Sequence, residues 1–153
     1  YHGWGDVFVF IFFGLIAVPG TYYLQIGEVS ELSLLIGVAI GMLSNAILVV
    51  NNLRDADTDK VSGKRTLAVQ LGKKFSKIQY SILMLTPFLL LLYIWWHSKN
   101  EWSLLITMFA LPKSLHLINQ IFSLTDSDLN FVLSQTARFL IIFTVLLSTG
   151  LII

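Results

Sequence analysis

Five stretches of this chain are each long and apolar enough to cross the hydrocarbon core of a membrane, which takes about 20 helical residues. The first three contain no Asp, Glu, Lys or Arg, whereas a water-soluble helix carries polar residues along one face. Charged residues make up 12% of the chain, about half of what a soluble domain carries. The sequence therefore predicts an all-α, polytopic transmembrane helix bundle with five membrane helices, held in a lipid bilayer. The stretches are Val7–Ile26, Leu32–Val50, Ile78–Trp96, Trp102–Phe122 and Phe131–Ile153.

Two kinds of residue are expected to shape these helices. Pro19 and Pro112 lie inside the first and fourth stretches, and we expect each to kink its helix because proline removes a backbone hydrogen bond. Gly37 and Gly41 have the small-xxx-small spacing that lets membrane helices approach closely. We therefore expect the second helix to pack tightly through these glycines.

The overall charge and the cysteine content exclude several classes of function. The net charge of +1 gives no general attraction for nucleic acid, so no nucleic-acid partner is expected. The chain has no cysteine, which excludes disulfides, thiolate metal sites and a cysteine nucleophile.

The distribution of basic residues predicts the orientation in the membrane. Seven of the ten lie in the connector 51–77, which is therefore expected to face the cytoplasm. Tyr1 and the loop 122–130 then face the same side, and Ile153 ends on the opposite side. The seven are Arg54, Lys60, Lys64, Arg65, Lys73, Lys74 and Lys77.

An acid-rich segment directly follows the second apolar stretch. If the helix continues through it, Asn51, Asp55 and Asp59 recur at i, i+4 and i+8 and project from one face. Two carboxylates one turn apart repel each other unless a cation lies between them, and Mg²⁺ prefers a few carboxylates together with phosphate oxygens and water. We therefore predict that Asp55 and Asp59 bind Mg²⁺, with Asp57 pointing elsewhere.

Basic residues lie a few positions downstream of these acids. Lys64 and Arg65 follow Gly63, and a cationic pair beside a metal site suits a diphosphate group. Together, the metal and the basic side chains would stabilise pyrophosphate as it leaves an allylic carbon.

Two simpler interpretations of the segment remain to be weighed. A charged connector between membrane helices is usually a solvated loop, although three acids within five residues at a helix end are uncommon for one. An EF-hand loop is excluded, because Lys60 stands where the loop needs glycine and Thr66 where it needs glutamate.

Further polar residues lie inside the last two apolar stretches. Ionisable residues at membrane depth are functional candidates, and we place Lys113 with the diphosphate-binding residues. Arg138 is expected to reach the nearby cytoplasmic surface, and His116 to be interfacial or packed.

The segment Asn51–Gly72, NNLRDADTDKVSGKRTLAVQLG, resembles the second aspartate-rich motif of the UbiA-type intramembrane prenyltransferase superfamily. Within that superfamily it is most similar to the members that prenylate 1,4-dihydroxy-2-naphthoate. Support comes from residues 1–6, YHGWGD, which lead into an aromatic-rich helix, and from Gly20-Thr21-Tyr22-Tyr23.

The resemblance implies a nine-helix fold, of which residues 1–153 would be helices five to nine. They would form the C-terminal part of a single transmembrane domain. No other segment here has three acids within five residues, so the first aspartate-rich motif is expected in an N-terminal part of the same enzyme. The resemblance makes Asp55 and Asp59 the catalytic, metal-binding acids, and adds Arg54 to the diphosphate-binding set of Asn51, Lys64, Arg65 and Lys113.

The implied reaction is the transfer of a polyprenyl group from polyprenyl diphosphate to 1,4-dihydroxy-2-naphthoate, with Mg²⁺ as cofactor and loss of CO₂, giving demethylmenaquinone. The implied location is the inner (cytoplasmic) membrane of a bacterium, with the active-site loop in the cytoplasm. Two alternatives stay open. The acceptor could instead be 4-hydroxybenzoate, homogentisate or a chlorophyllide. A membrane transporter or cation channel is the other, although its carboxylates would be expected at mid-membrane.

Overall fold

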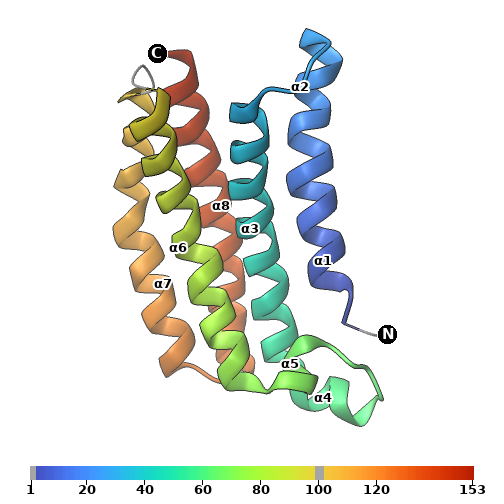
Figure 1. The fold of residues 1–153 in the computed structure, drawn as a ribbon. Coiled ribbons are helices and arrows are strands. Elements are labelled where there is room, and N and C mark those ends of the chain that lie inside the picture. The colour runs from blue at the N-terminus through green and yellow to red at the C-terminus, as the bar shows by residue number, and fades with distance from the viewer. Residues whose placement is uncertain (1–2, 99–101) are drawn as a thin grey trace.

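A computed structural model describes residues 3–98 and 102–153, and both ranges are helical without any strand (Figure 1). Five helical segments are long and apolar enough to cross a membrane, which confirms the predicted fold class of a polytopic helix bundle. These segments are Gly5–Ile26, Glu31–Arg54, Lys73–His97, Trp102–Ser123 and Asp126–Ile152. The protein is a multi-pass membrane protein.

The first and fourth segments change helix geometry close to their prolines. The first consists of α1 (Gly5–Val9), the π-helical η1 (Phe10–Ala17) and α2 (Val18–Ile26), and Pro19 lies in the first turn of α2. The fourth consists of the 3₁₀-helical η2 (Trp102–Ala110) and α7 (Leu111–Ser123), with Pro112 in the first turn of α7. Because proline has no N–H to donate to the preceding turn, the regular α-helical hydrogen-bond pattern is interrupted there, and the helix type changes just before each proline.

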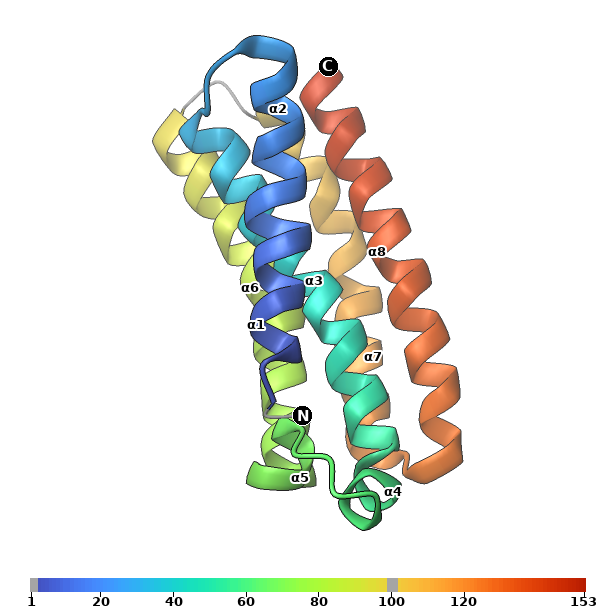
Figure 2. The same cartoon turned by 90° about the vertical axis from the view of Figure 1, so that its right-hand side faces the viewer.

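Helix α3 (Glu31–Arg54) lies at the centre of the bundle, with the first segment, α6 (Lys73–Ser98) and α8 (Leu129–Ile152) packed around it (Figures 1 and 2). Its span is 61% buried, against 11% for the first segment. The predicted close approach at Gly37 and Gly41 is confirmed, because a Cβ atom on Gly41 would lie 2.8 Å from the Cα atom of Gly14 in η1. The small residues let the two backbones meet.

The other long helices are joined by aromatic packing and by buried polar contacts. The ring of Phe88 on α6 packs edge-on against that of Phe143 on α8, with ring centres 5.6 Å apart. Nearby, the hydroxyl groups of Tyr80 and Thr136 share a hydrogen bond of 2.8 Å. Buried hydroxyl groups need such partners where no water is present.

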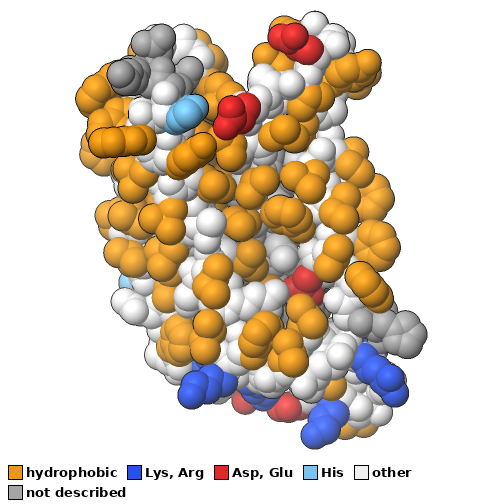
Figure 3. Space-filling view, viewed as in Figure 1, with side chains coloured by type: hydrophobic (Ala, Val, Ile, Leu, Met, Phe, Trp, Pro, Cys, Tyr) orange, Lys and Arg blue, Asp and Glu red, His pale blue; other side chains and the backbone are white. Residues whose placement is uncertain are grey.

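Some acidic side chains lie at one end of the bundle, whereas the Lys and Arg side chains in view gather at the other end (Figure 3). There the connector forms two short helices, α4 (Ala56–Val61) and α5 (Leu67–Leu71), and the short η3 (Asp126–Asp128) precedes α8. The Nζ atom of Lys77 donates to the carbonyl oxygen of Phe122 at 3.2 Å, so the connector and the loop 122–130 lie at the same end. This agrees with the predicted orientation, which puts both loops on one side of the membrane.

Candidate active site

The backbone changes direction at Asp55, in the middle of the acid-rich segment. Helix α3 ends at Arg54, and α4 begins at Ala56 after Asp55 adopts φ −90° and ψ 3°. Helical hydrogen bonds continue across this point, since the N–H of Asp59 donates to the carbonyl oxygen of Asp55 at 2.8 Å. A single straight helix carrying all three side chains on one face is therefore not what forms, and α4 turns away from the axis of α3 (Figure 1).

Arg54 organises the polar groups at the end of α3. Its Nε and Nη2 atoms both donate to the carboxylate of Asp55, each at 2.7 Å, in a two-pronged ion pair. Nη2 also donates to Oδ1 of Asn51 at 2.9 Å, and Nη1 donates to Oδ1 of Asn130 on α8 at 2.8 Å. The planar guanidinium can satisfy several oxygens at once, so one side chain links α3 to α8.

This ion pair sets the ionisation of Asp55. The hydrogen bonds from Arg54 hold the pKa of the Asp55 carboxyl below its ordinary value. Partial burial acts against this lowering, while the positive charges of Arg54 and Lys64 add to it. Asp55 is therefore a carboxylate at neutral pH, the form that a metal ion needs.

Asp59 has a different cationic partner. Its Oδ1 atom accepts a hydrogen bond of 2.8 Å from Nζ of Lys64, and the Asp59 side chain is only 8% exposed. Gly63 adopts φ +75°, a left-handed conformation that glycine takes without strain, and the chain turns back so that Lys64 reaches Asp59. Lys64, which the sequence analysis placed near the diphosphate, thus contacts Asp59 directly in the structure.

Two neighbouring charged residues lie outside this arrangement. Arg65 is exposed, and its carbonyl oxygen accepts a hydrogen bond from Gln70. Asp57 is 76% exposed and pairs with Lys73 at 2.7 Å, in agreement with the prediction that it points away from Asp55 and Asp59.

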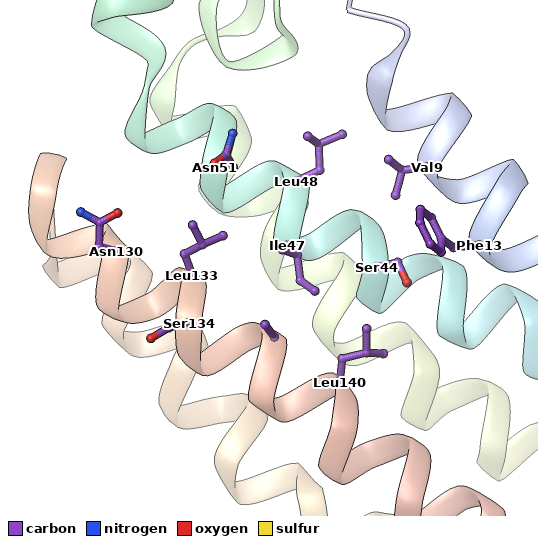
Figure 4. A pocket seen from close by; sticks show the side chains of 11 residues that line it. Val9, Phe13, Ser44, Ile47, Leu48, Asn51, Asn130, Leu133, Ser134 and Leu140 are labelled. Atoms are coloured by element: carbon purple, nitrogen blue, oxygen red, sulfur yellow. The ribbon is translucent and has the colours of Figure 1, made fainter.

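An apolar pocket of about 600 Å³ opens beside the polar cluster (Figure 4). It lies between the first segment, α3 and α8, and its walls include Phe13, Ile47, Leu48 and Leu140. Asn51 and Asn130, the two residues that Arg54 joins, stand together at one end of it. The pocket thus has an apolar body and a polar end, as an amphiphilic substrate with a charged head would require.

Asn130 is a site residue that sequence reasoning missed. It lies 76 positions from Arg54 in the chain, just after Asp126 and Asp128 of the last loop. A polar residue directly before the fifth predicted span was the available signal, but nothing in the sequence connects it with Arg54.

Lys113 lies apart from this cluster. Its Nζ atom donates to Oε1 of Gln135 at 3.2 Å, and both residues line a separate pocket between α7 and α8. The structure therefore brings together Asn51, Arg54 and Asp55. In the following helix α4, Asp59 pairs with Lys64. Lys113 is not among these residues.

The carboxylate oxygens of Asp55 and Asp59 are of the type that Mg²⁺ prefers as ligands. The carboxylates of Asp55 and Asp59 each already hold a cationic side chain, so the cluster attracts positive charge. Within residues 3–98 and 102–153, no group of three or more His, Cys, Asp or Glu residues is close enough to form a metal site. Magnesium takes six oxygen ligands, so most of them would have to come from a substrate phosphate, from water or from another part of the protein.

Five membrane-spanning helices, with an acid-rich connector beside an apolar pocket, define a polytopic membrane protein with a charged site at the end of its central helix. The chain belongs to the UbiA prenyltransferase family, which it matches over residues 1–142. Members of this family generally depend on Mg²⁺.

Three similar proteins within this family have names that state or imply prenyl transfer. The chain is 35% identical to a 1,4-dihydroxy-2-naphthoate octaprenyltransferase of Haemophilus influenzae, over 100% of this chain and 50% of that protein. It is 49% identical to a protein of the same name from Mycobacterium leprae, over 55% of this chain and 29% of the relative. Human UbiA prenyltransferase domain-containing protein 1 is 32% identical over 76% of this chain and 34% of its own length. The chain thus spans half or less of the length of these relatives.

Proposed function

We propose that the intact protein transfers a polyprenyl group from polyprenyl diphosphate to 1,4-dihydroxy-2-naphthoate, with loss of CO₂, as a step of menaquinone synthesis. The observation that carries the proposal is the position of the Asn51–Arg54–Asp55–Asn130 cluster at the polar end of the apolar pocket. An isoprenoid chain would lie along the apolar walls, because water cannot solvate it, while its diphosphate would meet the polar end. The names of the naphthoate-prenylating relatives support the choice of acceptor.

The chain's own residues would act mainly through charge. Bound Mg²⁺ would supply positive charge at the diphosphate, which favours cleavage of the allylic C–O bond. Asp55 and Asp59 would hold the ion, and Asn51 would orient Arg54. Arg54 and Lys64 now neutralise the two acids, so both would become available to the diphosphate when the ion takes over the carboxylates. Arg65, which is exposed on the same connector, is a further contact for the diphosphate.

The proposal also covers the side of the membrane on which the site lies and an N-terminal part of the same enzyme. The connector 51–77 would face the cytoplasm of a bacterial cell, where a soluble aromatic acid can reach it. An N-terminal part of the same polypeptide would supply the other aspartate-rich motif and close the pocket along the first segment, which is little buried by this part of the chain.

The decisive experiment compares acid variants of the full-length enzyme. Asp55→Asn and Asp59→Asn, which keep the size of the side chain, should each reduce prenyl transfer by at least about a hundredfold, because an interaction made only in the transition state would be lost. Asp57→Asn is the matched control and should leave the rate within about threefold, because Asp57 is solvated and faces Lys73. Membranes would be assayed with labelled polyprenyl diphosphate and Mg²⁺.

The same assay tests the acceptor. We expect product with 1,4-dihydroxy-2-naphthoate and much less with 4-hydroxybenzoate or homogentisate. Preference for another acceptor would reject the naphthoate assignment and keep the prenyltransferase. Normal turnover by both acid variants, with each inserted in the membrane, would reject the proposed site itself.

A further inference from the structure

A second pocket, of about 310 Å³, lies between α7 and α8, and polar residues line it although both helices belong to membrane-spanning segments. Four of its six lining residues are polar, and none is acidic. Ionisable side chains within membrane spans are costly, so they usually have a function. The lining residues are Lys113, His116, Leu117, Gln120, Phe131 and Gln135.

Some hydrogen-bond donors and acceptors in this pocket have no partner among the described residues. The Lys113 ammonium has three N–H donors, and its hydrogen bond goes to Gln135 at 3.2 Å. Oε1 of Gln120 is buried without a hydrogen-bond partner in the described part of the chain. Lipid tails can hydrogen-bond to neither group. A suitable ligand would therefore carry an anionic group for the Lys113 ammonium and a hydrogen-bond donor for Oε1 of Gln120.

The pocket lies in the half of the membrane next to the acid-rich connector. Ser123 ends α7 at that side, and at 1.5 Å per residue Gln120 lies about 5 Å and Lys113 about 15 Å from the end of the helix. Gln135, whose side chain accepts the hydrogen bond from Lys113, lies about 9 Å from the start of α8. The 24 residues of α8 measure about 36 Å, which exceeds a hydrocarbon core of about 30 Å, so the first turn of α8 reaches the head groups. The ammonium therefore points from mid-membrane toward the head-group layer.

The surroundings of the pocket are apolar and open. Leu115, Phe122 and Phe131 are 46%, 50% and 52% exposed, respectively. A pocket that holds a lysine and two amide groups beside exposed apolar side chains matches a molecule with an anionic head and hydrocarbon tails. Basic pockets between membrane helices on the cytoplasmic side are known to take phospholipid head groups.

We propose that this pocket binds the phosphodiester head group of an anionic phospholipid from the leaflet next to the connector. Lys113 pairs with the phosphate, His116 and Gln135 donate to its oxygens, and a head-group hydroxyl, as in phosphatidylglycerol, donates to Gln120. The acyl chains lie along Leu115, Phe122 and Phe131.

This site is independent of the proposed prenyltransferase site. Phe131 and Gln135 project from a different face of α8 from Asn130, Leu133 and Leu140, which line the first pocket. The second pocket also has no carboxylate to hold the Mg²⁺ that accompanies a diphosphate. Its occupant is therefore a phosphodiester lipid rather than the prenyl donor.

The test is native mass spectrometry of the purified full-length protein, titrated with dioleoylphosphatidylglycerol and, separately, dioleoylphosphatidylcholine. We expect tighter binding of phosphatidylglycerol. Lys113→Met should weaken it about tenfold, as the loss of a charge-assisted hydrogen bond would, and Lys113→Arg should restore most of it. Lys60→Met removes the same charge from an exposed position of the connector and should change nothing. His116→Leu provides a second variant at an exposed position, in case Lys113→Met does not fold.

Three results would overturn the proposal. Equal binding of the two lipids would mean that the pocket recognises no head group. Unchanged phosphatidylglycerol binding by the folded Lys113→Met variant, or by His116→Leu if that variant must replace it, would place the lipid elsewhere. Release of bound phosphatidylglycerol by inorganic pyrophosphate would make the pocket a diphosphate site. Loss of prenyl transfer plays no part in the test, so its outcome does not depend on the proposed function.

Discussion

Replacing Asn130 tests whether the last helix contributes to the site through Arg54. In Asn130→Ala, Nη1 of Arg54 loses its 2.8 Å hydrogen bond, while the ion pair with Asp55 and the contact with Asn51 remain. A hydrogen bond to a charged group contributes about 1.5–3 kcal/mol when buried. The Arg54 side chain is 24% exposed, so water compensates for part of the loss and about 1 kcal/mol is expected. That corresponds to a fall of about fivefold in kcat/KM.

The assay is steady-state prenyl transfer by the full-length enzyme, arranged as a double-mutant cycle. If Asn130 acts through Arg54, Asn130→Ala should have almost no further effect in an Arg54→Met background. Asn119→Ala makes the same change at an exposed position of α7 and serves as the control. A full fivefold effect of Asn130→Ala in both backgrounds would refute the link, as would an effect no larger than that of Asn119→Ala.

Two further predictions concern the Arg54–Asp55 ion pair and the apolar pocket. Because Arg54 lowers the pKa of Asp55, their pairing stabilises the protein above the ordinary carboxyl value of 3.8 and is lost as the pH falls through the lower, folded value. The difference in melting temperature between the wild type and Arg54→Met, measured in detergent, should therefore be present at about pH 6 and shrink by about pH 3, and a constant difference would contradict the ion pair. Leu140→Trp should fill part of the apolar pocket and reduce transfer from a long polyprenyl diphosphate more than from a short one. Ile141→Trp adds the same bulk at a position that is 64% exposed, and equal effects of the two variants would argue against a chain-binding role for the pocket.

The candidate site could be predicted in part from the sequence because its acids and their cations are close neighbours in the chain. Lys64 lies five positions from Asp59, and Arg54 adjoins Asp55, so the sequence already placed the acids and the basic residues in one short segment. The change of direction at Asp55 could not be predicted, because residues with good helix propensity lie on both sides of it. The continuous helix on which the single-face arrangement depended is therefore interrupted at Asp55.

The sequence by itself determined which segments lie in the membrane, which end carries most of the basic residues and where three acids cluster, because hydropathy and charge are local properties of the chain. Tertiary structure decided that Asn130 meets Arg54 and that Lys113 meets Gln135. These contacts depend on how α8 rotates against α3 and α7, and that rotation follows from side-chain packing between helices far apart in sequence. Lys113, which the sequence placed with the diphosphate-binding residues, thus lines a different pocket from Asn130, which sequence reasoning missed.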